Sequence, residues 1–396
     1  MSSKTLKKFL ADEIADLKNK GVFRPLRIVD GHQAPWTVID GKKVINLSSN
    51  NYLNLTNHPK VIEAARKATL EYGAGAGAVR TIIGTMRLHD ELEKKLAAFK
   101  KVEAVLVFQS GFCANQGSIG SIMTKDDLIF SDRLSHASII DGCRLSRAKI
   151  VVYEHNDPKD LQAKLEEYRE NPGKKLIVTD SVFSMDGDIA PLPELVDVAE
   201  KYDAFFFVDD AHASGVLGSC GRGSVDHFGL HGKVDIQMGT LSKAIGVMGG
   251  YIAGSRDLID YMIHRGRPML FSTAHPPSVP ASVIAAIDIL QNEPEHMERL
   301  WSNVEFWKTE LRNIGFNIGN SVTPITPVII GEEAASMKFS DRLMELGVFA
   351  QGIVFPTVPR GTGRVRTIIT AGHSKDDLIK ALVAFQKAGK EFGAIS

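Results

Sequence analysis

The sequence has few cysteines, no excess of either charge and no long apolar run, and each absence excludes a class of protein. Its 396 residues include three cysteines, Cys113, Cys143 and Cys220, and an odd number without a CxxC pair excludes a disulfide framework. Because no HExxH spacing occurs either, we predict no metal site. Lys and Arg together number 47, as do Asp and Glu, so the chain lacks the basic surface of a nucleic-acid-binding protein.

Segments that would direct the chain to a membrane are also lacking. No apolar window approaches the roughly 20 residues that a membrane-spanning helix needs. The N-terminal stretch places Leu6, Phe9, Leu10, Ile14 and Leu17 at helical spacing with charges between them, and it lacks the apolar core and cleavage site of a signal peptide. We therefore expect a cytoplasmic protein with neither nucleic acid nor a membrane as a partner.

Short apolar runs alternate with charged amphipathic stretches through the middle of the chain. Strands that alternate with helices predict right-handed crossovers and a mainly parallel sheet covered on both faces, which is an α/β fold. Helical patterns include His89–Phe99 and Pro193–Lys201. The expected strands are Ala104–Phe108, Leu128–Ser131, Lys149–Tyr153, Leu176–Thr179, Phe205–Val208, Ile236–Gly239 and Tyr251–Ala253.

The pattern changes after about residue 292 and predicts a second, smaller α+β domain. A helix over His296–Leu311 precedes three strands, Ile325–Ile330, Val348–Val354 and Arg364–Ile369, and a last helix runs from about Lys375 to Lys390. We expect an N-terminal segment, residues 1–48, to pack with this C-terminal domain, residues 292–396. The large domain would then occupy residues 49–291.

Two polar segments at predicted strand ends could carry chemistry. Lys243 follows a short strand in GTLSKAIGVMGG, at the sheet edge where open α/β sheets bind ligands, and burial there would make its amine nucleophilic. Asp209 ends the apolar strand in FFFVDDAHASG, and a carboxylate in that place needs a cationic partner such as a protonated pyridine nitrogen. The alternative interpretations are an exposed lysine and an aspartate that only caps a helix or a turn.

Three further strand ends give weaker signals. Ser110, Gly111 and Phe112 in VFQSGFCANQGS begin a predicted helix whose backbone N–H groups could hold a phosphate, although an ordinary strand-to-helix turn has the same pattern. His136 in SDRLSHASIID could stack on a cofactor ring, or it could cap a helix or lie in the core. Ser184 in VTDSVFSMDGD could hydrogen-bond a ring oxygen or belong to a plain turn.

Taken together and in this order, these segments resemble the α-oxoamine synthases, a family of fold-type-I enzymes that depend on pyridoxal 5′-phosphate (PLP). The resemblance covers nearly the whole chain, from SSNNYLNLTNHP through SGFCANQGS, SHASIIDG, SVFSMDGD, VDDAHASGVLG and GTLSKAIG to PTVPRGTGRVRTIITAGHS. It implies a seven-stranded type of sheet in the large domain, a homodimer with shared active sites, and PLP bound to Lys243 as a Schiff base.

The resemblance also implies a role for each matched residue. Lys243 would move the substrate α-proton, Asp209 would pair with the pyridine nitrogen, and His136 would stack on the ring; with His212, these are the implied catalytic residues. Ser184 and His212 would contact the ring oxygen, and the phosphate would be bound by Ser110, Gly111, Phe112 and Thr240 and, from a second subunit, by Ser272 and Thr273. Arg366 would bind the substrate carboxylate. The rest of the substrate would contact Asn50, Arg24, Thr357 and His136.

The family's reaction joins an amino acid to an acyl-CoA and releases CoA. The segments VRTIIGT and RPMLFSTAHPP resemble glycine C-acetyltransferase, so the expected substrates are glycine and acetyl-CoA and the expected product is 2-amino-3-oxobutyrate. The first alternative is an 8-amino-7-oxononanoate synthase, which uses alanine and a pimeloyl thioester, or a dual activity. 5-Aminolevulinate synthase and serine palmitoyltransferase are more distant options. An aminotransferase or a catalytically silent subunit would belong to a different class.

Overall fold

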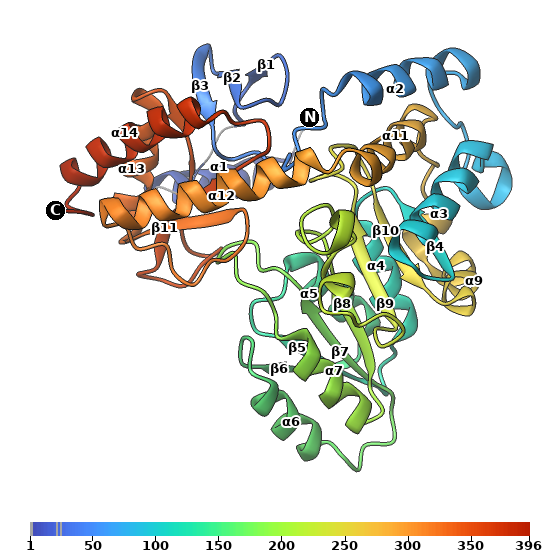
Figure 1. Cartoon of the computed structure of the whole chain (residues 1–396). Helices are drawn as coiled ribbons and strands as arrows, with labels where there is room; N and C mark the ends of the chain where they lie inside the picture. The colour runs from blue at the N-terminus through green and yellow to red at the C-terminus, as the bar shows by residue number, and fades with distance from the viewer. Residues whose placement is uncertain (1–2, 21–22, 24–25) are drawn as a thin grey trace.

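The structure, a computed structural model, describes residues 3–20, 23 and 26–396. The middle of the chain forms a large α/β body, and the beginning and the end of the chain meet in a smaller group of strands and helices beside it (Figure 1). The long helix α12 (Glu295–Ile314) leads from the one to the other. The predicted limits of the domains, at residues 48 and 291, stay a prediction.

The large body is built on a mixed, mostly parallel sheet of seven strands. Their order is β4-β10-β9-β8-β7-β5-β6; β10 runs antiparallel to both of its neighbours and the other neighbours are parallel. Each predicted strand of this region is found within a residue or two of its expected ends. The strands are β4 (Ala104–Phe108), β5 (Leu128–Asp132), β6 (Lys149–Tyr153), β7 (Lys175–Asp180), β8 (Phe205–Asp209), β9 (Ile236–Thr240) and β10 (Gly250–Gly254).

Side chains alternate along these strands, and helices cover both faces of the sheet. In β4, Val105 and Val107 belong to one core with α2 (Pro59–Tyr72), α3 (Arg87–Lys100) and α11 (Ser278–Asn292). Leu106 and Phe108 belong to another core with α4 (Gly111–Ile122), α5 (Ala137–Ser146) and α9 (Arg256–Arg265). Helices α6 (Pro158–Glu167) and α7 (Leu192–Lys201) enclose a third core with β5, β7 and β8.

The smaller group contains two sheets, and one of them joins the two ends of the chain. Strands β1 (Val29–Asp30), β2 (Trp36–Ile39) and β3 (Lys42–Asn46) form a meander, and β12 (Val348–Phe349) pairs in parallel with β3. Strands β11 (Ile325–Gly331), β14 (Gly363–Ile368) and β13 (Gln351–Ile353) form the other sheet. Helix α14 (Lys375–Glu391) packs against both α12 and α13 (Glu333–Glu345).

The C-terminal part differs from the expectation in two respects. The single strand predicted over Val348–Val354 is two short strands in different sheets, because the chain changes partner from β3 to β14 at Ala350. Helix α13 was not predicted. Its buried stripe includes Ser336 and Ser340, whose hydroxyls donate to Glu332 O (2.8 Å) and Ala350 O (2.6 Å), so the apolar periodicity is weak.

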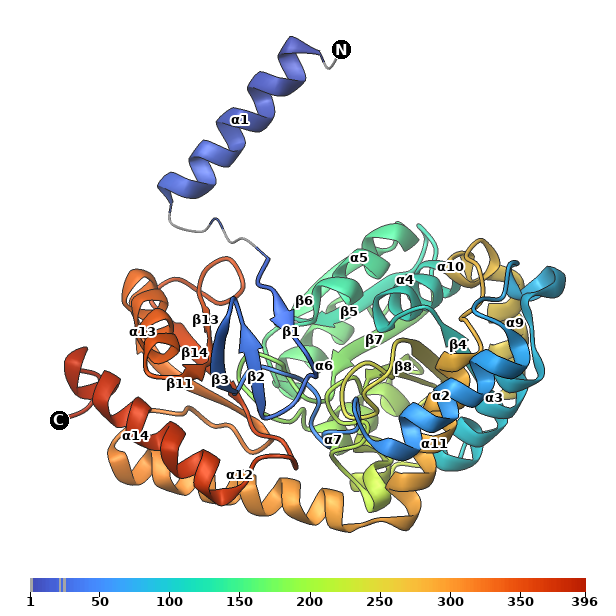
Figure 2. The same cartoon turned by 90° about the horizontal axis from the view of Figure 1, so that it is seen from above.

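The first helix, α1 (Lys4–Asn19), has the amphipathic spacing predicted from the sequence, but none of its residues is buried. Figure 2 shows it extending away from the rest of the chain. Its apolar side chains Leu6, Phe9 and Leu10 are each about half exposed. Among the described residues, no helix is long and apolar enough to cross a membrane.

Candidate active site

The carboxyl ends of several strands meet at one edge of the large sheet and bring polar residues together. Asp180 at the end of β7 lies opposite Asp209 at the end of β8. Gly250 pairs both with Thr240, which ends β9, and with Phe108, which ends β4. Lys243 follows Thr240 by three residues. This is the edge at which open α/β sheets bind their ligands.

Asp209 is a buried carboxylate with neutral hydrogen-bond partners. Its Oδ2 accepts from Asn115 Nδ2 (2.8 Å) and its Oδ1 accepts from the N–H of Ala211 (2.9 Å). Burial raises the pKa of Asp209 above its usual value, although Asn115, Lys243, Ala211 and His136 oppose this effect. A carboxylate in this state is stabilised by any cation that reaches it.

His136 is connected to Asp209 through two intermediate side chains. Its Nδ1 lies 2.7 Å from Ser138 Oγ, which accepts from Asn115 Nδ2 (2.8 Å), the same group that donates to Asp209. The backbone N–H of His136 donates to Asp180 Oδ2 (2.9 Å). Burial lowers the pKa of His136, and Lys243 adds to this while Asp209 opposes it. The imidazole is therefore fixed in orientation at its Nδ1 edge.

Lys243 has an unusually acidic ammonium group. Burial lowers the pKa of Lys243 to about 8; Asp209 and Asp180 raise it, and Arg366 lowers it further. A substantial fraction of this side chain is thus a neutral, nucleophilic amine slightly above pH 7.

The predicted phosphate contacts lie side by side at the start of α4. Ser110 caps this helix, and its Oγ accepts from the N–H of Cys113 (3.1 Å). A side chain on Gly111 would place its Cβ only 3.3 Å from Thr240 Cβ, and one on Gly250 would meet the Gly111 nitrogen at 2.4 Å. Gly250 must be a glycine for β10 to approach the helix N-terminus, and Gly111 leaves Thr240 close to the same place, where backbone N–H groups favour an anion.

His212 lies deep in the site and contacts a residue that the sequence analysis did not select. Its Nδ1 is 2.7 Å from the hydroxyl of Tyr52, which is also fully buried. Burial lowers the pKa of His212 well below its usual value, and Lys243, Arg366 and His136 lower it further. Burial raises the pKa of Tyr52. Both groups are therefore neutral near pH 7.

Arg366 connects β14 of the smaller group to this edge of the sheet. Its Nε donates to Ser184 O (2.5 Å) and its Nη2 donates to Asn50 Oδ1 (3.3 Å), so three predicted site residues are brought together. Burial lowers the pKa of Arg366. No carboxylate of the described residues forms an ion pair with this guanidinium, which leaves it able to bind an anionic substrate group.

The remaining predicted residues lie further out or outside the described part. Thr357 is exposed in a turn in which its N–H donates to Val354 O (3.0 Å), and within the described part of the chain no hydrogen bond joins it to the other site residues. Thr273 is exposed and its carbonyl accepts from Gln109 Nε2 (3.0 Å), next to Ser110; Ser272 precedes it. Arg24 lies outside the described residues.

The chain matches the family model described as aminotransferase class I and II over residues 42–385. It belongs to this family. Within the family, it is 58% identical over 98% of both chains to the 8-amino-7-oxononanoate synthase of Thermoanaerobacter pseudethanolicus, and 57% identical over 97% of both chains to 8-amino-7-oxononanoate synthase 1 of Bacillus subtilis.

Solved structures of α-oxoamine synthases have the same fold. A serine palmitoyltransferase variant from S. paucimobilis with a bound PLP–myriocin aldimine superposes with a TM-score of 0.93 at 34% identity, covering 99% of this chain and 100% of that one. The 8-amino-7-oxononanoate synthase of Francisella tularensis gives 0.75 at 26% identity, covering 88% and 98%. The predicted resemblance and the fold-type-I PLP transferase fold are thereby confirmed, and this α-oxoamine synthase uses PLP as its cofactor.

The residues at the sheet edge fit PLP in three respects. Asp209 offers a buried carboxylate to the ring nitrogen. Gly111 and Thr240 form a close-packed helix N-terminus suited to the phosphate. Lys243 offers an amine whose pKa is lowered toward neutrality, as a Schiff base requires.

The expected glycine C-acetyltransferase activity was wrong. The relatives that are 54–58% identical over nearly the whole chain are 8-amino-7-oxononanoate synthases. VRTIIGT, one of the two segments on which the expectation rested, makes contacts within the scaffold: Arg80 is paired with Glu93 (2.9 Å), and Val79 forms a β-bridge with Thr273. Neither of these contacts is made to Arg366 or Asn50, the residues expected to bind the amino acid.

The sequence analysis missed four residues that complete the site: Tyr52, Asn115, Ser138 and Asp180. Asn115 lies four residues after Gly111 and therefore one helical turn along the same face of α4, which is a usable signal. Ser138 follows His136 by two residues as part of its helix cap. Asp180 ends β7 as Asp209 ends β8, so the strand end was a usable signal for it as well. Tyr52 had no local signal, because its partner His212 lies far away in the sequence.

Proposed function

We propose that this chain is an 8-amino-7-oxononanoate synthase, which condenses alanine with a pimeloyl thioester in biotin synthesis. The new carbon–carbon bond joins the alanine Cα to the thioester carbonyl carbon; the thiol leaves, and the alanine carboxyl group leaves as CO2. The observation that supports this proposal is the 54–58% identity, over nearly the full length, to enzymes of that name. The site adds the partly buried Arg366, which forms no ion pair among the described residues, for an amino-acid carboxylate.

We propose that the edge residues hold PLP as follows. Lys243 forms the Schiff base, Asp209 keeps a proton on the ring nitrogen, and His136 stacks on the ring. The N–H groups of Gly111 and Phe112 and the hydroxyl of Thr240 bind the phosphate. When bound, PLP supplies an aldehyde that links to amino groups and a protonated ring that accepts electrons from the amino-acid Cα.

We propose that His212 and Ser184 contact the ring oxygen of PLP. Tyr52 can donate its hydroxyl proton to His212 Nδ1, because the phenol stays protonated and the imidazole stays neutral. In that arrangement the proton of the imidazole lies on Nε2, which becomes a hydrogen-bond donor. Tyr52 would thus select the tautomer that the ring oxygen requires.

We propose that Arg366 and Lys243 act on the substrate amino acid in turn. Arg366 binds the carboxylate, and its hydrogen bonds to Ser184 O and Asn50 Oδ1 hold its plane in place. The freed amine of Lys243 would then take up the Cα proton as a neutral base once the substrate amine had taken its place. The lowered pKa of Lys243 provides that neutral form near pH 8.

A thiol-release assay tests the proposed function. Alanine, glycine and serine are each paired with pimeloyl-CoA and with acetyl-CoA, and the free thiol and the CO2 are both measured. We expect alanine with pimeloyl-CoA to give the highest kcat/KM, with one CO2 for each thiol. A preference for glycine with acetyl-CoA would contradict the proposal, and production of an α-keto acid without thiol would indicate an aminotransferase.

The acidity of Lys243 predicts how PLP rebinding depends on pH. Only the neutral amine can attack the cofactor aldehyde, so the association rate with cofactor-free protein should rise about tenfold per pH unit below about 8 and level off above it. Stopped-flow absorbance of the protein-bound cofactor measures this rate. A plateau that begins only above about pH 10 would show an unperturbed lysine.

The guanidinium of Arg366 predicts a selective effect on the amino acid. Arg366→Lys keeps the charge but loses the planar fork, so we expect the KM for alanine to rise about tenfold or more while the KM for the thioester changes little. Steady-state kinetics with each substrate varied in turn provide the measurement. If only the thioester KM rose, the assignment of the carboxylate to Arg366 would be wrong.

We also propose a homodimer in which Ser272 and Thr273 contact the phosphate of the second copy. Thr273 is exposed, and the nearby Phe271 is 70% exposed. The segment that is bridged to Thr273 through Val79 exposes two more apolar side chains, Ile82 (81%) and Ile83 (80%). Large apolar side chains gathered on an exposed segment are typical of a protein interface. Sedimentation equilibrium tests this proposal, and a monomer at the concentrations used for the assay would contradict it.

A further inference from the structure

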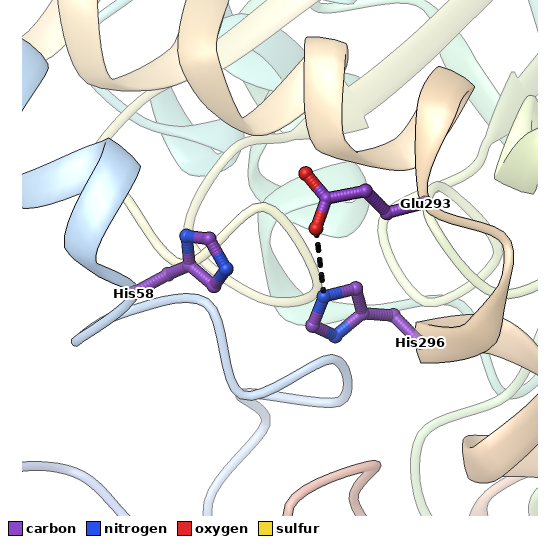
Figure 3. Close-up of side chains that lie close together, drawn as sticks. All are labelled: His58, Glu293 and His296. Carbon is purple, nitrogen blue, oxygen red and sulfur yellow. Dashed lines mark ion pairs between the residues drawn. The ribbon is translucent and has the colours of Figure 1, made fainter.

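Three potential metal ligands meet where the large body passes into the smaller group. His58 caps the start of α2, Glu293 follows the end of α11, and His296 is the second residue of α12 (Figure 3). One ligand atom from each residue lies within 4.8 Å of the other two, and all three side chains are half-buried. They come from two distant segments of the chain, so no local sequence motif contains all three.

The side chains face one another. His296 Nε2 is 3.7 Å from Glu293 Oε2, and the two imidazole rings lie edge to face with their centroids 5.6 Å apart. Figure 3 shows the tip of the His58 ring directed toward the same gap as the carboxylate and His296. In a tetrahedral zinc site, with bonds of about 2.0–2.1 Å, neighbouring ligand atoms lie about 3.3 Å apart. The Glu293–His296 pair, at 3.7 Å, is already close to that separation.

The surroundings of Glu293 leave one of its oxygens available. Lys60 Nζ donates to Oε1 (2.6 Å) and fixes the carboxylate, while Oε2 faces His296. A second partner that orients a ligating carboxylate is a regular feature of metal sites. Binding would also have a cost. His58 Nδ1 accepts a long hydrogen bond from the N–H of Lys60 (3.3 Å), and ligation through Nε2 would place a proton on Nδ1 and break this exposed contact.

We propose that His58, Glu293 and His296 form a zinc-binding site, completed by water. Two imidazoles and one carboxylate are a ligand set that suits Zn²⁺ and is too rich in nitrogen for Mg²⁺ or Ca²⁺. The ion would join the start of α2 to the connection between α11 and α12, so its effect is on stability. Because none of these residues belongs to the proposed active site, this inference does not depend on the proposed function.

Zinc titration of the PLP-loaded protein tests the site. After treatment with a chelator and desalting, we expect calorimetry to give one Zn²⁺ per chain and the melting temperature to rise by about 2–5 °C at saturating zinc. His58→Ala, His296→Ala and Glu293→Gln should each weaken binding at least tenfold. His264→Ala, in the last turn of α9 and exposed, is the matched control and should bind as the unchanged protein does.

Two further measurements, with Co²⁺ and with cofactor-free protein, distinguish binding at this site from binding to cysteine thiolates or to PLP. Co²⁺ should give the visible absorption of a nitrogen- and oxygen-ligated ion, and that absorption should disappear in His58→Ala and His296→Ala. The same stoichiometry without PLP would show that the cofactor is not the ligand. Zinc binding that is equal in all four variants, or an absorption band typical of thiolate ligands, would place the ion elsewhere and overturn the proposal, as would the absence of binding.

Discussion

Replacing Lys243 by alanine should lower turnover of alanine and pimeloyl thioester about 10³-fold or more. A positioned general base contributes about 10²–10⁴-fold to a rate, and this lysine would also be the covalent anchor of PLP. Two neighbouring groups are poorly placed to replace it: Arg366 cannot give up its proton at neutral pH, and the buried His212 is engaged by Tyr52. The variant should retain its fold, because an alanine removes only the end of a half-buried side chain.

Three measurements check this result. Steady-state kinetics give the loss of turnover, and the absorbance of the Schiff base should be missing from the variant. Borohydride reduction of the unchanged protein, followed by peptide mass mapping, should find the cofactor on Lys243. Lys233→Ala, which removes an exposed lysine paired with Glu200 (3.0 Å), is the control and should behave as the unchanged protein. Cofactor found on another residue would contradict the assignment.

The central sheet could be predicted from the sequence because its strands carry their own signal. The run FFFVD becomes β8, buried except for its first residue, and the aspartate at its end reaches the sheet edge as expected. The same logic located Lys243 and Ser110, since each lies within three residues of the end of a strand. A residue that acts close to the end of its own strand can be recognised from local sequence alone.

Residues whose role depends on a distant partner could not be predicted in the same way. Tyr52 belongs to the site because its hydroxyl contacts His212, which lies 160 positions away in the sequence. Arg366 is held in place by hydrogen bonds to Ser184 and Asn50. The exchange of sheets between β12 and β13 likewise depends on which strands lie beside them, and the apolar pattern of one continuous run contains no such information. The substrate could not be predicted for the same reason. The segment VRTIIGT suggested glycine and acetyl-CoA, but in the structure its Arg80 forms an ion pair with Glu93 of α3.

The second large effect is expected for Asp209→Asn. The amide keeps the size of the side chain but removes the charge that would hold a proton on the ring nitrogen, so we expect kcat to fall about 10²-fold or more. A reduction of two pKa units in the ring nitrogen corresponds to about 2.7 kcal/mol, which is sufficient for that loss. Cofactor retention should also fall, as measured by dialysis and absorbance, and Asp209→Glu should recover part of the activity.

The adjacent carboxylate, Asp210, gives a matched control, because it is buried in an ion pair with Lys100. It forms an ion pair with Lys100 (2.9 Å), both side chains being at most 1% exposed, and it accepts from Ser181 Oγ (2.8 Å). Removing one partner of a buried pair costs about 3–5 kcal/mol, so Asp210→Asn should lower the melting temperature strongly. Asp209→Asn should instead lose rate with a much smaller change in melting temperature. If the two variants exchanged these phenotypes, Asp209 would be the structural carboxylate and the proposed contact with the cofactor ring would be wrong.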